Sequence, residues 1–225
     1  MVHLVQNTHR LIASRWPTVG VFDLVASPED IAAALELEML TNDRLAPTPE
    51  RLHALPMDRW VVGVPNASII MAAYLHADEK GSRFTTGELG GWYCSFDLVT
   101  SIRETVWHHT ARLAHSEAGF HQTIQMRQLH AHADAEFDDV RGMRTTRPEL
   151  YRPDNYEASQ AFGAERRNAA SNGICYDSVR HEGGTNLVIY RPALVLDVMQ
   201  GDHFQYEWTG ERDPRVSKLT NMAAF

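Results

Sequence analysis

The sequence predicts a mixed α/β fold of the α+β kind, in one domain that spans residues 1–225. Three observations support this prediction. Strand-like and helix-like stretches follow one another along the whole chain, without a repeat or low-complexity tract. No shift of composition marks a second domain. The length allows one full hydrophobic core, and 44% hydrophobic with 22% charged residues is ordinary for a globular protein.

The N-terminal third, residues 1–78, is expected to be mainly helical and to precede the core over residues 79–225. Val2 to Ile12 alternates weakly between apolar and polar residues, which is compatible with an edge strand. Ser27 to Asp30 combines a capping serine, a proline at the first helical position and two acidic residues. This pattern predicts a helix that ends near Asn42, and a second helix is expected from Asn66 to His76.

The stretch from Gly81 to Leu113 predicts a strand, a glycine-rich turn, a second strand and a helix. Ser82–Thr85 and Trp92–Phe96 have strand-like residues. Asp97 or Thr100 can cap the helix that follows. Its buried stripe is expected to consist of Ile102, Val106, His109 and Leu113, which recur at helical spacing.

Beyond this helix the chain is expected to return to strands. Thr123 to Ala135 alternates imperfectly, which predicts a strand with a bulge near Gln128. Tyr156 to Ala170 has the pattern of an amphipathic helix. Further strands are expected at residues 174–176, 186–190, 193–199 and 203–208, the last two as an edge pair across Gly201 and Asp202.

Charge and cysteine content narrow the class of protein. A net charge of −8 with scattered Lys and Arg argues against a direct nucleic-acid partner. Cys94 and Cys175 both lie in apolar strand-like runs, which indicates buried thiols in a reducing compartment. The N-terminus has no apolar run of signal-peptide length, and the chain has no run of about 18 apolar residues. We therefore expect a cytoplasmic protein without membrane contact.

Two separated blocks make the chain similar to a known family. Gly81 to Leu113 sets Arg83, Tyr93 and Glu104 at fixed offsets, and residues 173–187 contain Ser178. This order resembles the RES domain family, named for an Arg, a Glu and a Ser, which Arg83, Glu104 and Ser178 would supply. The two blocks and the segment before them cover most of the chain.

The resemblance also has departures and structural implications. Thr85 stands where relatives often carry Asn or Ser, and Cys94 stands where a small residue such as Ala is usual. The resemblance implies an ADP-ribosyltransferase-like fold, with a bent, split sheet flanked by helices.

The resemblance implies a bacterial enzyme that consumes NAD by phosphorolysis or hydrolysis of its nicotinamide–ribose bond, as the toxin of a toxin–antitoxin pair. NAD would be the substrate rather than a cofactor, inorganic phosphate is a candidate co-substrate, and no metal is expected. The partner would be an Xre-type helix-turn-helix antitoxin, and a homodimer stays open. The catalytic residues would be Arg83, Tyr93, Glu104 and Ser178, and the substrate-binding residues Arg83, Tyr93, Ser178, His109 and Asn186.

The chemistry of these side chains agrees with that assignment. A carboxylate such as Glu104 can stabilise the oxocarbenium-like sugar that forms when the bond to nicotinamide breaks. Arg83 can hold a diphosphate through its planar fork, and Tyr93 can stack on nicotinamide. A hydroxyl at Ser178 can meet a phosphate or the carboxamide.

Two alternatives stay open at the level of sequence. The first is transfer of ADP-ribose to a protein acceptor, because a protein side chain, water and phosphate can all attack the same cation. The second is a non-catalytic metal- or ligand-binding module. Its ligands would come from His108, His109, His115, His121, His130, His132 and Asp134, whose spacings match no specific metal signature.

Overall fold

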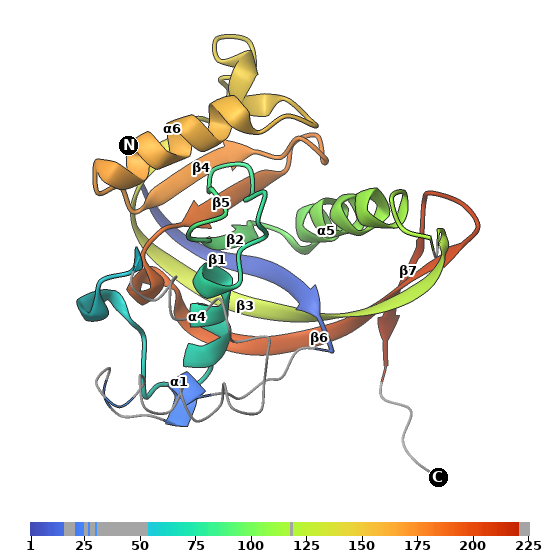
Figure 1. The fold of residues 1–225 in the computed structure, drawn as a ribbon, viewed down its shortest axis with the longest axis horizontal. Helices are drawn as coiled ribbons and strands as arrows, with labels where there is room; N and C mark the ends of the chain where they lie inside the picture. Colours follow the sequence, from blue (N-terminus) through green and yellow to red (C-terminus); the bar gives the residue numbers. More distant parts are fainter. Residues whose placement is uncertain (16–20, 25–26, 28–29, 31–53, 118, 221–225) are drawn as a thin grey trace.

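The computed structural model describes residues 1–15, 21–24, 27, 30, 54–117 and 119–220 (Figure 1). These residues form one seven-stranded mixed sheet with α-helices packed on it. The mixed α/β class predicted from the sequence is therefore confirmed. The strands are β1 (Val2–Ala13), β2 (Trp92–Ser95), β3 (His121–Asp139), β4 (Gly173–Asp177), β5 (Thr185–Ile189), β6 (Leu196–Thr209) and β7 (Arg215–Leu219).

The sheet is mixed because β3 and β4 are parallel, whereas the other pairs are antiparallel. The strand order is β1-β2-β5-β4-β3-β6-β7, with a further pairing between β1 and β3. The α-helices of the described residues are α1 (Val21–Leu24), α4 (Ala67–Leu75), α5 (Leu98–Leu113) and α6 (Glu157–Asn168), with 3₁₀ turns η2 (Met57–Arg59), η3 (Pro148–Tyr151) and η4 (Pro192–Leu194). The helix expected from Ser27 to Asn42 lies outside the described residues.

The N-terminus corrects the expectation of a mainly helical first part. It begins with β1, which pairs with β3 from Val2 opposite Phe137 to Ala13 opposite Met126. It also pairs with β2, so β1 is not an edge strand. Together with the pairs β2–β5, β5–β4 and β4–β3, these contacts close a ring of five strands. The alternation of Val2 to Ile12 indicated a strand, but its pairing with a segment more than 100 residues away leaves no local signal.

The main hydrophobic core packs α4 against β2 and β3. Trp92 of β2 and Tyr74 of α4 are fully buried in it. The Tyr74 hydroxyl donates to the Ile189 carbonyl of β5 at 3.1 Å, so its polar end is satisfied. Both cysteines are buried free thiols, as predicted, and Cys94 and Cys175 belong to this core.

Helix α5 packs on the other half of the sheet, beside the long curved strands β3 and β6 (Figure 1). Its predicted cap is confirmed, because the Asp97 carboxylate accepts from the Thr100 N–H at 2.8 Å. Its predicted apolar stripe is also confirmed, with Ile102, Val106 and Leu113 against a cluster that includes Leu11, Met126, Phe204, Tyr206 and Trp208. Helix α5 is therefore fixed at its start and along one face.

Two local expectations need correction, and one is confirmed. Residues Ser82–Thr85 form a tight turn with a single bridge instead of a strand. The two strands expected on either side of Gly201 are one continuous strand, β6. The bulge near Gln128 is confirmed by a register shift between β3 and β6 at this position.

None of the helices in the described ranges is both long and apolar enough to cross a membrane.

Candidate active site

A row of polar side chains crosses one face of the sheet at β2, β5 and β4. Ser95 is the register partner of Asn186, and Asn186 is the register partner of Tyr176. Partners in an antiparallel ladder project to the same face, and residues two apart share that face. Tyr93 therefore lies on the same face as Ser95, opposite to the core residue Trp92.

Glu104 reaches this row from the second turn of α5. Its Oε1 atom accepts hydrogen bonds from Ser178 Oγ at 2.7 Å and from Asn186 Nδ2 at 2.6 Å. The amide of Asn186 is itself oriented by Ser95, whose hydroxyl donates to Asn186 Oδ1 at 2.7 Å. The second carboxylate oxygen, Oε2, accepts no hydrogen bond from any residue of the described ranges. The carboxylate is thus held by one oxygen, and the other is available.

Ser178 follows β4 and positions this carboxylate. Its Oγ atom accepts from the backbone N–H groups of Arg180 at 3.1 Å and His181 at 3.0 Å. Its own N–H donates to the Gly184 carbonyl at 2.8 Å. Because two donors occupy the oxygen, the hydroxyl proton is directed to Glu104. Ser178 therefore already has partners on both sides, whereas the sequence suggested a hydroxyl free to meet a ligand.

Arg83 is a buried cation, with 7% of its surface exposed. Its Nη1 atom donates to the carbonyls of Leu150 at 3.0 Å and Arg152 at 2.9 Å, and its guanidinium lies 4.7 Å from the centroid of the Tyr156 ring. No carboxylate of the described chain pairs with it. Burial of a charge without a counter-charge is unfavourable, so this position favours an anionic ligand.

Tyr93 is tied to the turn that carries Arg83. Its hydroxyl oxygen accepts from the Phe84 N–H at 2.9 Å and lies 3.2 Å from Thr85 Oγ1. Desolvation raises the pKa of Tyr93 to about 12, so the phenol stays protonated at neutral pH. Thr85, one of the two departures from the family pattern, therefore helps to hold a candidate site residue in place.

Tyr176 is a site residue that sequence reasoning missed. Its ring is buried and meets Phe84 edge to face at 4.9 Å between centroids. Its hydroxyl makes no hydrogen bond to the part of the chain that the structure describes. Desolvation, and then the charge of Glu104, raise the pKa of Tyr176, while Arg83 acts in the opposite direction. Both site charges are thus within electrostatic range of this phenol. The available signal was its position two residues before Ser178, near the end of β4.

Two more arginines border the hydrogen-bond network formed by Glu104, Ser178, Asn186 and Ser95 (the Glu104 network). The Nη2 atom of Arg144 donates to the Ser178 carbonyl, and the Arg180 guanidinium stacks on Trp107 at 3.3 Å from the ring centroid. Neither arginine pairs with a carboxylate among the described residues. Although the whole chain carries a charge of −8, the surroundings of Glu104 are therefore rich in positive charge.

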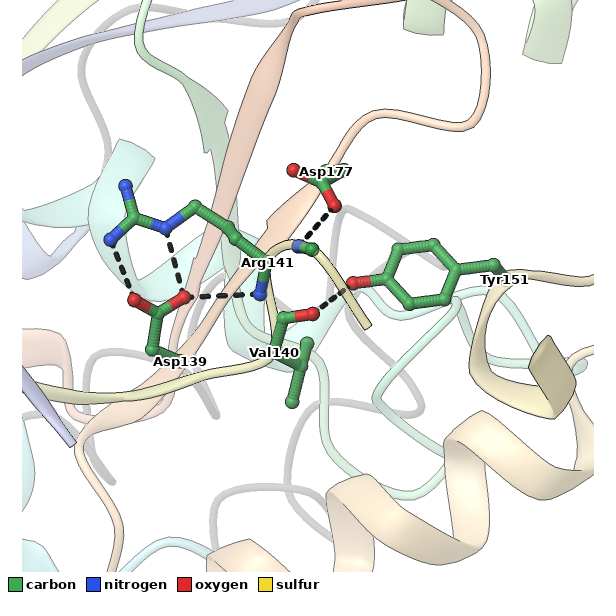
Figure 2. A network of polar contacts seen from close by, with 6 residues as sticks. Asp139, Val140, Arg141, Tyr151 and Asp177 are labelled. Carbon is green, nitrogen blue, oxygen red and sulfur yellow. Dashed lines mark hydrogen bonds and ion pairs between the residues drawn. The ribbon is translucent and has the colours of Figure 1, made fainter. Parts of the chain in front are cut away.

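The segment that carries Arg144 is fixed by a polar network at the ends of β3 and β4 (Figure 2). The Asp139 carboxylate accepts from Arg141 Nε at 2.8 Å and from Arg141 Nη2 at 2.6 Å. The Asp177 carboxylate accepts from the Gly142 N–H at 2.7 Å, and the Tyr151 hydroxyl donates to the Val140 carbonyl. Since Asp177 directly precedes Ser178, this network also fixes the start of the segment that contains the site serine.

The histidines on α5 face in different directions. The His109 ring meets Tyr206 and Trp208, each at 6.5 Å between centroids, so it packs against β6 and away from the Glu104 network. This placement does not support the expected contact of His109 with a substrate. His108, one helical turn after Glu104, lies on the side of Arg180 and Arg83. Desolvation, followed by the charges of Arg112 and Arg180, lowers the pKa of His108 to about 4, although the residue as a whole is exposed.

The histidines of β3 do not converge with an acidic residue on one point. His132 Nδ1 lies 3.1 Å from Asn7 Oδ1, and Asp134 pairs with His3 at 3.1 Å. Within the described ranges, no group of three or more His, Cys, Asp or Glu side chains is placed to hold a metal ion. The alternative of a metal-binding module built on these histidines therefore finds no support in the geometry.

Comparisons with known proteins concern the family and the fold of the chain. Over 213 residues, which are 94% of this chain and 86% of the relative, the sequence is 26% identical to the uncharacterized protein y4oC of Sinorhizobium fredii (strain NBRC 101917 / NGR234). The fold is similar to that of a chain in the crystal structure of the M. tuberculosis MbcT–MbcA toxin–antitoxin complex, with a TM-score of 0.50 at 10% identity. That likeness covers 92% of this chain and 86% of the other.

The strongest finding concerns the family. The model of the RES domain matches residues 55–209, a range that contains Arg83, Tyr93, Glu104 and Ser178. This match covers well over half of the 225 residues. The chain therefore belongs to the RES domain family.

Proposed function

We propose that this protein consumes NAD by cleaving the bond between nicotinamide and ribose, with phosphate or water as the acceptor. One observation carries the proposal. Glu104 is held through Oε1 by Ser178 and Asn186 while Oε2 is available. The buried cation Arg83, whose charge acts on Tyr176 as that of Glu104 does, has no carboxylate partner among the described residues. A ligand that develops a positive charge and carries a diphosphate complements both groups.

In this proposal Arg83 binds the diphosphate. Its Nη1 atom is fixed by two backbone carbonyls, which leaves Nε and Nη2 for a bidentate contact. Because the guanidinium is already ordered by these bonds and by Tyr156, little further side-chain entropy is lost on binding. The phenols of Tyr93 and Tyr176 would border the nicotinamide ring.

Glu104 would act on the chemical step. When the bond between the ribose carbon and nicotinamide breaks, its electron pair returns to the ring nitrogen, and nicotinamide leaves as a neutral molecule. The positive charge passes to the sugar, where a fixed carboxylate stabilises it. Phosphate, or water that loses a proton to the solvent, then forms the new bond at the same carbon. The leaving group is cationic before the reaction, so this scheme requires no general acid.

We further propose that the protein is the toxin of a bacterial toxin–antitoxin pair. The support is membership of the RES family and the likeness of fold to the MbcT–MbcA structure, whose title names a toxin–antitoxin complex. The partner in this proposal is an Xre-type helix-turn-helix antitoxin that covers the site. The sheet would then be a variant of the ADP-ribosyltransferase-like architecture, within one domain.

The test is to incubate the purified protein with NAD, with and without inorganic phosphate, and to identify the products by mass spectrometry. Phosphorolysis yields nicotinamide and ADP-ribose with a phosphate on the former nicotinamide-bearing carbon, whereas hydrolysis yields nicotinamide and free ADP-ribose. Transfer of ADP-ribose to a protein would instead require an added acceptor. The absence of nicotinamide both with and without phosphate would contradict the proposal.

A further inference from the structure

A polar cavity lies apart from the Glu104 network. It has a volume of about 320 Å³ and lies between the end of α6, the end of β5 and the 3₁₀ turn η2. Arg59, Arg167 and Arg191 contribute to its wall, and no Asp or Glu is among its described lining residues. None of the candidate active-site residues lines it. Three cations therefore share a cavity whose described wall carries no counter-charge.

Arg167 is the most constrained of the three. Its Nη2 atom donates to the Gly90 carbonyl at 2.6 Å, and its guanidinium lies 4.5 Å from the centroid of the Tyr190 ring. Its Nη1 atom is buried and has no acceptor among the described residues. An unsatisfied buried donor on a cationic group is costly, and an acceptor that enters the cavity would remove that cost.

A purely structural role accounts for part of this arrangement. The Nη2 atom of Arg191 donates to the Ala170 carbonyl at 2.6 Å, just after the C-terminus of α6, where cations are favourable. That role uses one donor of Arg191, as the Gly90 contact uses one of Arg167. It gives no reason for Arg59, which lies in η2 and is exposed. Three like charges at one cavity repel each other unless an anion lies between them.

We propose that this cavity binds a small molecule that carries a phosphate group. Guanidinium groups match the geometry of phosphate oxygens, and three of them can balance a doubly charged phosphate monoester. Leu55 and Leu89 also line the cavity, so it offers apolar surface beside the cations. Its volume is at the lower end of the range typical of small-molecule sites, which leaves room for an organic group next to the phosphate.

The experiment is calorimetric titration with inorganic phosphate and with AMP as a phosphate monoester. The variants are Arg191→Gln and Arg59→Gln, each of which removes one cation from the cavity. Arg215→Gln removes the same charge from the exposed strand β7, on the opposite side of the molecule from α6 (Figure 1). Arg83→Gln separates this cavity from phosphate binding at the active site. Thermal unfolding of each variant checks that it is folded, and exposed Arg59 serves as the second probe if Arg191→Gln does not fold.

We expect Arg191→Gln and Arg59→Gln to weaken the binding of at least one probe by about tenfold or more, the effect of losing one charge-assisted contact. Arg215→Gln and Arg83→Gln should retain that binding event. Two results would overturn the inference. One is that neither probe binds the wild-type protein. The other is that Arg83→Gln abolishes all binding while both cavity variants bind as the wild type does.

Discussion

Replacement of Glu104 by glutamine tests whether the charge of this residue, rather than its shape, drives the reaction. In the structure Oε1 accepts two hydrogen bonds and Oε2 accepts none from the described residues. The amide oxygen of Gln can take the place of Oε1, and its NH₂ group the place of Oε2. We therefore expect Glu104→Gln to fold normally, with a change in unfolding free energy below about 1 kcal/mol.

The rate should respond far more strongly. Removal of one preorganised electrostatic stabiliser costs about 10²- to 10³-fold in kcat, or about 2.7–4 kcal/mol. The assay is nicotinamide release from NAD at saturating substrate, with circular dichroism and thermal unfolding to verify the fold. Glu211→Gln, at an exposed position before β7, is the matched control and should keep the wild-type rate. If Glu104→Gln keeps more than about a third of that rate, the central carboxylate has been misassigned.

Three further predictions follow from the same geometry. Arg83→Lys keeps the charge but loses the planar fork, so NAD binding measured by calorimetry should weaken by about 1–3 kcal/mol, whereas Arg215→Lys should have no effect. Unchanged affinity would mean that Arg83 does not bind the diphosphate and only holds the backbone carbonyls of Leu150 and Arg152 in place. Desolvation, and then the charge of Arg112, lower the pKa of His109 from its ordinary value of 6.5 to about 4. The folded state therefore resists protonation, and the stability that His109 contributes above pH 6.5 is lost as the pH falls toward 4. The Tm of His109→Gln should accordingly fall less between pH 7 and pH 5 than the Tm of the wild type. The control is His115→Gln, which alters an exposed histidine and should behave as the wild type does. Equal falls of Tm in all three proteins would refute this prediction. Turnover should also survive exhaustive chelation, because a cationic leaving group needs no Lewis acid, and loss of turnover that zinc restores would point to a metal-dependent step.

The elements that could be predicted from sequence are those set by local chemistry. Asp97 caps α5 because its carboxylate reaches an N–H three residues later, a contact that sequence spacing alone defines. The stripe of Ile102 and Val106 follows from the helical period. The bulge near Gln128 was visible because one additional residue breaks the alternation of a strand.

The elements that could not be predicted depend on contacts between distant segments. The place of β1 is decided by its ladder with β3, which no pattern within Val2–Ala13 reveals. Gly201 was interpreted as a turn residue, yet β6 continues through it. A Cβ atom at this position would lie 2.5 Å from His130 Nε2 on the neighbouring strand. The glycine is therefore explained by close packing across the sheet.

The same division holds for the candidate site. Resemblance to the family assigned Arg83, Glu104 and Ser178 to the site, and the structure describes their contacts. The resemblance could not reveal that Ser95 and Tyr176 flank Asn186, because that proximity is a property of strand register. The difference between His108 and His109 is also geometric, since a step of one residue turns a side chain by about 100° around the helix axis.

The most direct test of the central claim is a time course of nicotinamide release from NAD by the purified protein in the presence of a chelator. The prediction is that the amount released exceeds the amount of protein many times over, and that Glu104→Gln reduces the initial rate by about 10²-fold or more. No release by a folded wild-type protein that binds NAD, or equal rates for the wild type and Glu104→Gln, would contradict it.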